Sequence, residues 1–404
     1  MTLAKKVVTS SILVAALGYF VDIYDLVLFS IVRIKSLKGL GLPDAALLSK
    51  GVLLLNMQMA GMLLGGILWG ILGDKKGRLS VLFGSIFIYS AANIANGFVQ
   101  NIEFYAWLRF IAGIGLAGEL GAGITLVSEV MDKETRGFGT MIVATIGILG
   151  AVVAALVGDL FDWRTAYFIG GGLGLGLLFL RIGVYESGMF SNLRSKAVKR
   201  GSFSTLFKSP ATAVKYLACI MIGVPIWYVI GILITFSPEF GAALGMAQIP
   251  DPGRSILFTY IGLALGDFTS GSLAQLFKSR KKIAATFILL TSIFIGTYLF
   301  FQGASLARFY GNCLALGFSI GYWAVFVTIA SEQFGTNIRS TVTTTAPNFV
   351  RGSVVPLTFF FQKLKVPFGI IGSAAWVGAA SLILALLALS FLEETHGKDL
   401  DYYD

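Results

Sequence analysis

The sequence predicts an all-α membrane protein of twelve transmembrane helices, arranged as two pseudo-symmetric bundles of six. Three observations support this fold class. Of the 404 residues, 56% are hydrophobic and only 13% are charged, whereas about 25% of the residues of soluble proteins are charged. Apolar runs of roughly 18 residues or more, the length that a helix needs to cross a bilayer, recur along the whole chain. The spacing of charged residues in the first half also recurs in the second half.

The apolar runs define the expected membrane spans. In chain order they are 7–33, 47–73, 79–100, 104–130, 137–159, 165–184, 211–236, 254–277, 283–301, 306–331, 340–361 and 367–391. The first run is too long for the apolar region of a signal peptide, contains Asp22 and Asp25, and is followed by no small-residue cleavage site. We therefore expect it to remain in the protein as the first span.

A polar segment rich in Ser, Lys and Arg divides the spans into six and six. The predicted domains are an N-terminal bundle (1–184), a cytoplasmic linker (185–210), a C-terminal bundle (211–391) and a cytoplasmic tail (392–404). Two related bundles with the substrate bound between them near the midplane are the architecture of carriers that rock between two open states. A channel is disfavoured by this repeat.

The net charge of +10 reflects membrane topology rather than nucleic-acid binding, because the basic residues lie in alternate loops. Basic residues concentrate in cytoplasmic loops, so both termini are expected in the cytoplasm. One loop on the opposite side carries Arg33, Lys35 and Lys38, which breaks the pattern and leaves a binding role for them open.

Residues for metal, redox or nucleophilic chemistry are scarce. Cys219 and Cys313 fall inside expected spans and are predicted to be packed thiols, and the lone His396 lies in the tail. The string from Gly113 to Gly118 fits Gly-x-Gly-x-x-Gly, but no strand precedes it, so these glycines are expected to let membrane helices pack closely. No P-loop or nucleophile elbow is present. The sequence therefore predicts no cofactor and no metal site, and disfavours an enzyme.

The loop after the second span reads Gly70-Ile-Leu-Gly-Asp74-Lys-Lys-Gly77-Arg78. It resembles the signature loop of the major facilitator superfamily, Gly-x-Leu-x-Asp-Arg-x-Gly-Arg. Further similar motifs are Arg109, the segment 129–137, Asp162-Trp163-Arg164 and the tail 393–398. The resemblance covers essentially the whole chain and is strongest to the branches of metabolite and aromatic-acid proton symporters. It implies the major facilitator fold.

Charged residues after the even-numbered spans are expected to gate the carrier. Asp74 can accept hydrogen bonds from a neighbouring helix and pair with Arg78, contacts that must form in one state and break in the other. A tight turn with solvated charges is the alternative. Glu129 and Arg136 stand seven residues apart, as do Glu332 and Arg339. The full expected gating set is Gly70, Asp74, Gly77, Arg78, Glu129, Arg136, Asp267, Glu332 and Arg339.

Charges inside the first four spans suggest proton coupling, because a charge at mid-bilayer is costly and marks function by default. Asp22 and Asp25 share one face of the first span, and Arg109 lies at a similar depth to Asp25. The resemblance ties such an aspartate and arginine to proton coupling, and a static ion pair is the alternative. Glu119, in the middle of the fourth span, is a further candidate for the proton, with a structural glutamate equally open.

Arg351 in the eleventh span is the main candidate for substrate binding. A guanidinium at this depth needs a carboxylate partner or an anionic substrate, and its fork suits a carboxylate. The alternative is a structural pair with Asp267, which would then act as a latch. Other candidates for the pocket are Tyr24, Asn56, Gln58, Trp227, Tyr228, Tyr322, Trp323 and Asn348, although aromatic residues in membrane helices commonly serve packing.

Together these features predict a secondary active transporter that couples protons to the symport of a small organic anion or polar metabolite by alternating access. Proton-coupled efflux and a receptor that binds without transport are the alternatives. The expected partners are a small anionic substrate, protons and the lipid bilayer, with no nucleic acid, and the expected form is a monomer. The expected location is a bacterial inner membrane.

Overall fold

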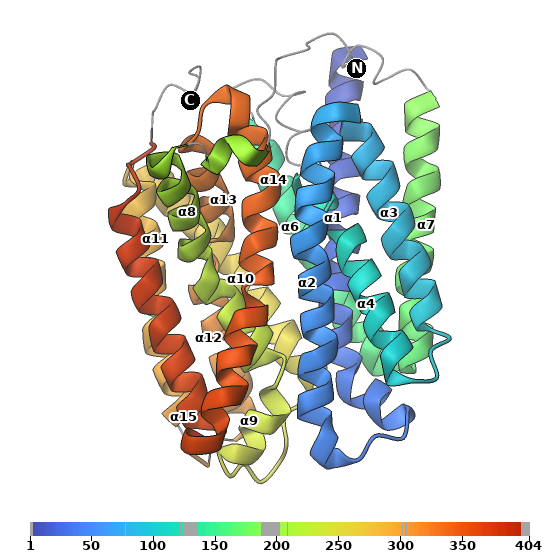
Figure 1. Cartoon of the computed structure of the whole chain (residues 1–404), viewed down its shortest axis with the longest axis vertical. Helices are drawn as coiled ribbons and strands as arrows, with labels where there is room; N and C mark the ends of the chain where they lie inside the picture. The colour runs from blue at the N-terminus through green and yellow to red at the C-terminus, as the bar shows by residue number, and fades with distance from the viewer. Residues whose placement is uncertain are drawn as a thin grey trace.

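The computed structural model describes residues 3–76, 78–121, 123, 136–186, 203–207, 209–300, 302–303 and 305–396. Figure 1 shows long helices gathered into two groups that stand side by side. Helices α1 to α7 form the N-terminal bundle, and α8 to α15 form the C-terminal bundle. Nine helices in the described part of the chain are long and apolar enough to cross a membrane. This all-helical, two-bundle architecture agrees with the sequence prediction.

The N-terminal bundle follows the expected spans closely. Polar side chains begin two of its helices: Asn101 accepts a 2.8 Å hydrogen bond from the amide of Phe104, and Asp162 accepts one of 2.9 Å from the amide of Arg164. The bounds are α1 Leu3–Gly39, α2 Asp44–Lys76, α3 Arg78–Asn96, α4 Ile102–Leu116, α6 Arg136–Leu160 and α7 Trp163–Glu186.

The C-terminal bundle is more interrupted. The seventh span passes from an α-helix into a π-helix, and α15 contains a break at Gly369, whose φ of 67° is the left-handed conformation that glycine tolerates. The elements are the 3₁₀-helix η2 Phe203–Phe207, α8 Pro210–Tyr228, the π-helix η3 Val229–Ile234, α9 Ser237–Ala243, α10 Pro252–Leu276, α11 Arg280–Phe300, α12 Leu306–Ser319, α13 Trp323–Glu332, α14 Thr336–Gly352 and α15 Val354–Ser390.

The expected tenth span, 306–331, is wrong as one continuous helix. Helix α12 ends at Ser319 and α13 begins at Trp323. At the break, a Cβ on Gly321 would lie 2.5 Å from the Cα of Gly266, so the backbone approaches α10 too closely for a side chain. The freed amide of Ala324 donates a 3.1 Å hydrogen bond to Asp267, which satisfies the start of α13.

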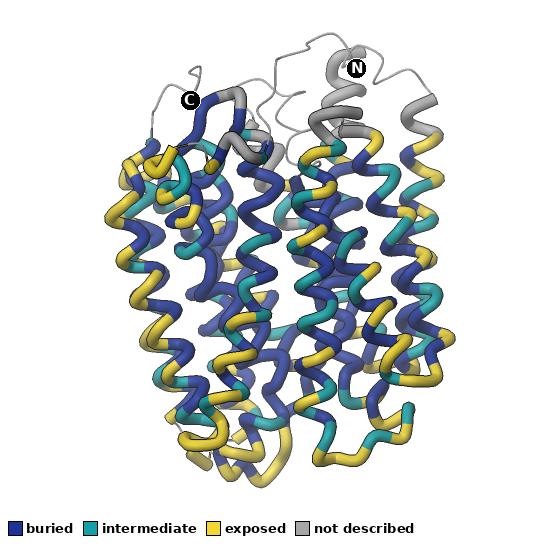
Figure 2. Tube along the Cα trace, in the orientation of Figure 1, coloured by how far each residue is buried: buried dark blue, intermediate teal, exposed yellow. Residues whose placement is uncertain are grey.

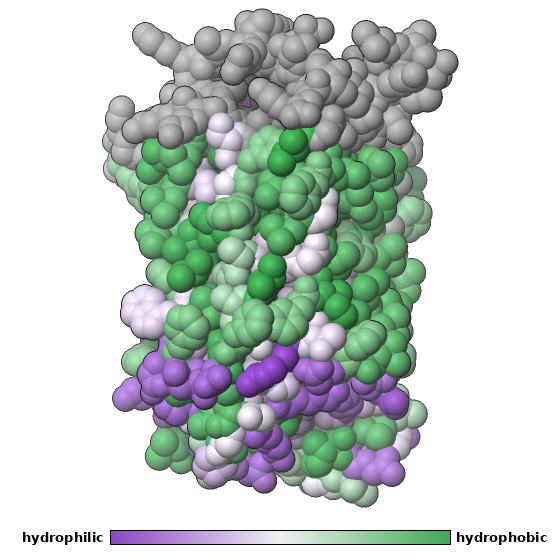
Figure 3. Space-filling model, turned by 90° about the vertical axis from the view of Figure 1, so that its right-hand side faces the viewer, coloured by the Kyte–Doolittle hydropathy of each residue, from purple (hydrophilic) through white to green (hydrophobic). Residues whose placement is uncertain are grey.

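The outer surface of the bundles is apolar, as expected for a protein surrounded by lipid. Large side chains such as Trp107, Phe179 and Phe268 are exposed, whereas charged residues such as Arg109 and Arg351 are buried. Figure 2 shows exposed positions along the outer flanks of helices, and Figure 3 shows a broad hydrophobic belt above a hydrophilic band. The molecule therefore has the inverted polarity of a membrane protein.

Glycines bring helices into close contact inside the N-terminal bundle. A Cβ on Gly113 would lie 2.0 Å from the carbonyl oxygen of Gln58, so α4 and α2 touch through their backbones. This confirms the packing role predicted for the glycine string. Cys219 and Cys313 are free, buried thiols, which confirms the prediction for them.

Candidate functional site

A buried ion pair joins the two bundles halfway along α1. Nη2 of Arg351, on α14, lies 3.3 Å from Oδ2 of Asp22, on α1. The two side chains are 1% and 0% exposed. Taking two charges out of water is costly, so this pair needs further polar partners or a function that requires it.

The polar capacity of this pair is only partly used. The Arg351 guanidinium lies 5.8 Å from the centroid of the Trp323 ring. Among the described residues, Nε and Nη1 of Arg351, Oδ1 of Asp22 and Nε1 of Trp323 have no hydrogen-bond partner. Each unmet buried polar group costs about 1–3 kcal/mol. The site thus presents three donors and one acceptor that a polar ligand could use.

Contacts between the bundles flank the Asp22–Arg351 pair on both sides. Toward the lower end in Figure 1, Arg33 pairs with Glu239 at 2.7 Å, and the hydroxyl of Ser30 bonds that of Thr235 at 2.9 Å. Toward the upper end, the amide of Asn348 donates a 2.8 Å hydrogen bond to the carbonyl of Ala117. Another cross-bundle bond, of 2.8 Å, joins Thr358 to Asn56.

The direct Asp25–Arg109 ion pair considered from the sequence is not formed within the described residues. Arg109 acts on Asp25 electrostatically but donates its hydrogen bond to Gln58 instead. Its guanidinium also lies over the rings of Phe29 and Tyr167, at 5.2 Å and 5.8 Å from their centroids. Both oxygens of Asp25 are buried and lack a partner in the part of the chain that the structure describes.

Glu119 forms a second buried ion pair, with Arg181 of α7. The two guanidinium nitrogens donate to the two carboxylate oxygens at 2.8 Å each. Ser85 adds a 3.3 Å hydrogen bond from α3. The sequence analysis missed Arg181, although it lies inside the expected span 165–184, where the cost of burying a charge could have identified it.

Several pocket candidates instead hold helices together within one bundle. The hydroxyl of Tyr24 donates to Ala166, that of Tyr228 to Ala374, and that of Tyr322 to Ile222, at 2.7 to 2.9 Å. Trp227 is buried. Asp267 receives the amide of Ala324, whereas Arg351 pairs with Asp22. Of the binding candidates, Arg351, Trp323, Asn348 and Asn56 therefore lie where the bundles meet.

The expected gating residues of the first half are only partly described. Gly70 faces α14, since a Cβ there would lie 3.6 Å from Cγ2 of Thr345. Asp74 lies in α2, Arg78 begins α3 and Arg136 begins α6, but their side chains are outside the described structure, as are Gly77 and Glu129.

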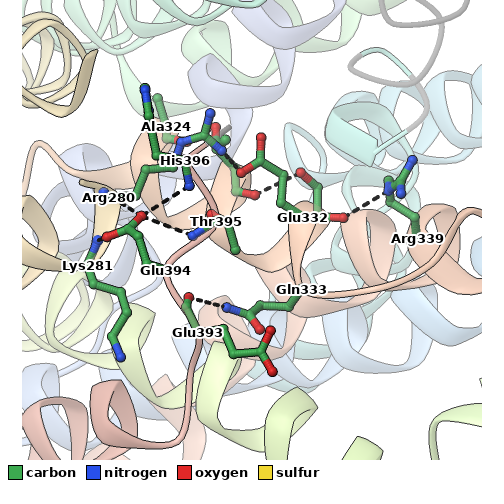
Figure 4. Close-up of polar contacts among 12 residues, drawn as sticks. Arg280, Lys281, Ala324, Glu332, Gln333, Arg339, Glu393, Glu394, Thr395 and His396 are labelled. Carbon is green, nitrogen blue, oxygen red and sulfur yellow. Dashed lines mark hydrogen bonds and ion pairs between the residues drawn. The ribbon is translucent and has the colours of Figure 1, made fainter. Parts of the chain in front are cut away.

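The corresponding residues of the second half form a polar cluster, shown in Figure 4. Arg280 pairs with Glu332, and Nε of Arg339 donates to the carbonyl of Ser331 at 3.1 Å. Glu394 receives the amides of Arg280 and Lys281 at 3.0 Å and 3.2 Å. This ties the end of the chain to the start of α11.

The pKa of Glu394 reflects this arrangement. Burial raises the pKa, but the hydrogen bonds from the Ser279 hydroxyl and from backbone amides outweigh it and lower the pKa to about 2. The carboxylate is therefore ionised at neutral pH and holds the tail in place.

Comparison with known proteins places this arrangement in a family. The family model described as Major Facilitator Superfamily matches residues 8–355. The chain belongs to the major facilitator superfamily. It is therefore a multi-pass membrane protein and a secondary transporter of small metabolites, not an enzyme. Within this superfamily, the meeting face of the two bundles, where Asp22 and Arg351 lie, is the expected place for a substrate.

Individual members of the major facilitator superfamily resemble the chain over most of its length. A protein described as a probable 4-methylmuconolactone transporter of Cupriavidus pinatubonensis is 26% identical over 403 residues, 94% of this chain and 89% of the relative. The gentisate transporter of Corynebacterium glutamicum is 24% identical and covers 78% of each chain. The niacin transporter of Acinetobacter baylyi is 33% identical over 162 residues, 39% of this chain and 36% of the relative.

A solved superfamily structure shares the fold. The proton:xylose symporter XylE, bound to 6-bromo-6-deoxy-D-glucose, superposes with a TM-score of 0.71 at 18% identity and covers 98% of each chain. This confirms the predicted fold of two six-helix bundles.

Proposed function

We propose that this transporter carries a small organic anion together with a proton by alternating access. The observation that carries the proposal is the Asp22–Arg351 pair, which is buried between the bundles and leaves two guanidinium nitrogens of Arg351 unused among the described residues. A substrate carboxylate fits these donors bidentately. The indole nitrogen of Trp323 supplies a third donor beside them.

Asp22 and the substrate compete for the same arginine. While Asp22 is ionised it holds Arg351 at 3.3 Å. When Asp22 takes up a proton, its charge disappears and Arg351 needs another anion, which the substrate provides. Proton and anion are then bound together, and the loaded site carries less net charge through the bilayer.

The relatives support an anionic substrate. Two of them are named for gentisate and niacin, and both of these molecules carry a carboxylate. The site in this chain offers a cation and an aromatic ring together, as an aromatic or other unsaturated acid would require.

We propose supporting roles for the surrounding charges. Asp25, unpaired among the described residues and close to Arg109, exchanges the coupled proton along with Asp22. The gating residues lie toward the two ends, with Asp74 and Arg78 in the first half and Glu332 and Arg339 in the second. The chain is proposed to act as a monomer in a bacterial inner membrane, with the upper end of Figure 1 in the cytoplasm and the domain limits set out above.

The test is a thermal-shift assay of the purified protein with gentisate, nicotinate and a panel of other organic acids at two pH values. A ligand at 100 times its Kd stabilises the folded state by about 2.7 kcal/mol, which is measurable as a rise in Tm. We expect wild type to bind its acid more tightly at the lower pH. Asp22→Asn, which mimics the protonated aspartate, should bind with no pH dependence, and Arg351→Gln should not bind.

A matched control and a coupling test complete the experiment. Arg164→Gln removes a guanidinium near the lower end, where it donates to Val99, and should bind like wild type. In proteoliposomes, Asp25→Asn should abolish uptake driven by a pH gradient while leaving exchange. If Arg351→Gln keeps the full thermal shift, the anion does not bind at this arginine.

A further inference from the structure

One face of α3 is polar and completely buried inside the N-terminal bundle. It carries Tyr89, Asn93 and Asn96 at steps of four and three residues, so their side chains share one side of the helix. Ser90 lies beside them, next to Gly174 of α7. All four residues are 0% exposed, and none belongs to the site between the bundles.

The polar atoms of this face are unsatisfied. Within the described residues, no hydrogen-bond partner exists for the Tyr89 hydroxyl, the Ser90 hydroxyl, or either polar atom of Asn93 and Asn96. The facing helices contribute further unpartnered atoms: both oxygens of Asp25, Nε and Nη1 of Arg109, and Nε2 of Gln58.

Such a concentration of unpaired groups has a physical consequence. Each buried donor or acceptor without a partner costs about 1–3 kcal/mol, and the total would exceed the stability of an ordinary domain, about 5–15 kcal/mol. Buried water molecules, which make about three hydrogen bonds each, are the usual solution where polar groups gather. The interior of the N-terminal bundle is therefore expected to be hydrated.

The polar face leads from one carboxylate to another. The Asn93 amide lies close to Asp25 without meeting hydrogen-bond geometry. Tyr89 is within electrostatic reach of both Asp25 and Glu119. One turn earlier, Ser85 donates a 3.3 Å hydrogen bond to Glu119. The charged groups that act on these side chains are Asp22 on α1, Arg109 on α4 and Arg181 on α7.

We propose that water bound along this face of α3 connects Asp25 with Glu119, and that a proton moves between these carboxyl groups inside the N-terminal bundle, apart from the substrate path between the bundles. This rests on the proton coupling proposed above. The proton leaves the Asp25 carboxyl for water, and the Tyr89 hydroxyl accepts a proton as it releases its own to the next water. Glu119 receives the last proton, Asp25 is left ionised and Tyr89 is unchanged.

Hydration is tested by radiolysis of water in the purified wild-type protein, with labelling located by mass spectrometry. Hydroxyl radicals formed from bound water label buried side chains that bulk water cannot reach. Tyr228 is a matched control, since it is equally buried but its hydroxyl donates to Ala374. We expect Tyr89 to be labelled several-fold faster than Tyr228. Equal labelling of the two tyrosines would refute the hydrated face.

The proton step is tested with Tyr89→Phe, which removes only a hydroxyl that bonds no other described group and should fold normally. After a rapid pH change, the infrared carboxyl signal should respond at least tenfold more slowly than in wild type, with the same final amplitude. Tyr228→Phe should respond like wild type. An unchanged rate in Tyr89→Phe would exclude Tyr89 from the route.

Neither measurement involves the organic anion, so the two proposals fail separately. A dry α3 face together with Arg351-dependent anion binding would remove the route and keep the proposed function. A hydrated face with no anion bound at Arg351 would do the reverse.

Discussion

Arg33 of α1 and Glu239 of α9 form a 2.7 Å ion pair that ties the lower ends of the two bundles together. Arg33 is completely buried, and its guanidinium also donates to the carbonyls of Leu47 and Thr235. The pair lies between the substrate site and the lower surface of the molecule. We therefore expect it to close that side of the transporter.

Removing the carboxylate should open the lower side. Glu239→Gln leaves Arg33 with carbonyl partners only, and losing one member of a buried ion pair costs about 3–5 kcal/mol, less where the partner is partly exposed as Glu239 is. Spin labels on the exposed Ser49 and Ala247 should move apart in electron–electron resonance distances. Cys219 and Cys313 are buried and should stay unlabelled.

The exchanged pair Arg33→Glu with Glu239→Arg should bring the two labels of that experiment back together. Asp44→Asn, which breaks only the exposed Lys38–Asp44 contact within the N-terminal bundle, should leave the distance unchanged. An unaltered distance in Glu239→Gln would show that the pair does not hold this side closed.

Glu119 and Arg181 should depend strongly on each other for stability. Glu119→Gln or Arg181→Gln alone leaves an uncompensated buried charge, and we expect a loss of about 3–5 kcal/mol in each case. The double variant should lose clearly less than the sum of the two. Thermal unfolding in detergent measures all three, and additive losses would mean that the pair is not coupled.

The α2–α4 contact should not tolerate a side chain at Gly113. Gly113→Ala places a methyl group 2.0 Å from the carbonyl oxygen of Gln58, and overpacking of this kind costs about 1–3 kcal/mol. Gly176→Ala is the control, because a Cβ there meets nothing within 4 Å. We expect a lower Tm for the first variant and an unchanged or higher Tm for the second; equal values would contradict the packing.

The tail should stay docked well into the acid range. The pKa of Glu394 is lowered from 4.5 to about 2, so its stabilising effect is complete above pH 4.5 and is lost as the pH falls through about 2. Pepsin should spare the tail of wild type near pH 4 and cut it near pH 2. Glu394→Gln should be cut at both, and protection of this variant would show that the charge is not needed.

Much of the fold follows from hydrophobic length, which needs no knowledge of tertiary contacts. The break between α12 and α13 was missed because the sequence stays apolar through Ile320, Gly321 and Tyr322. The cause lies elsewhere in the chain, in the close approach of Gly266 on α10. Local apolarity cannot report such a contact.

The site was predicted in its members but not in its pairings. Asp22 and Arg351 were both recognised as costly charges, yet they lie in different bundles and only the fold shows that they meet. Glu239 was overlooked because it falls just beyond an expected span. The polar face of α3 was also overlooked, although the spacing of Tyr89, Asn93 and Asn96 within the span 79–100 carried a helical signal.

The π-helix η3 supplies the geometry of the lower seam. A π-turn accommodates one residue more than an α-turn, so it changes the direction in which every later side chain of that segment points. Thr235, whose amide closes the π-turn on Ile230, contacts Ser30, and Glu239 one turn later contacts Arg33. We expect that deleting a single residue between 229 and 234 would turn both groups away from α1 together, as a key leaves two wards of a lock in one rotation.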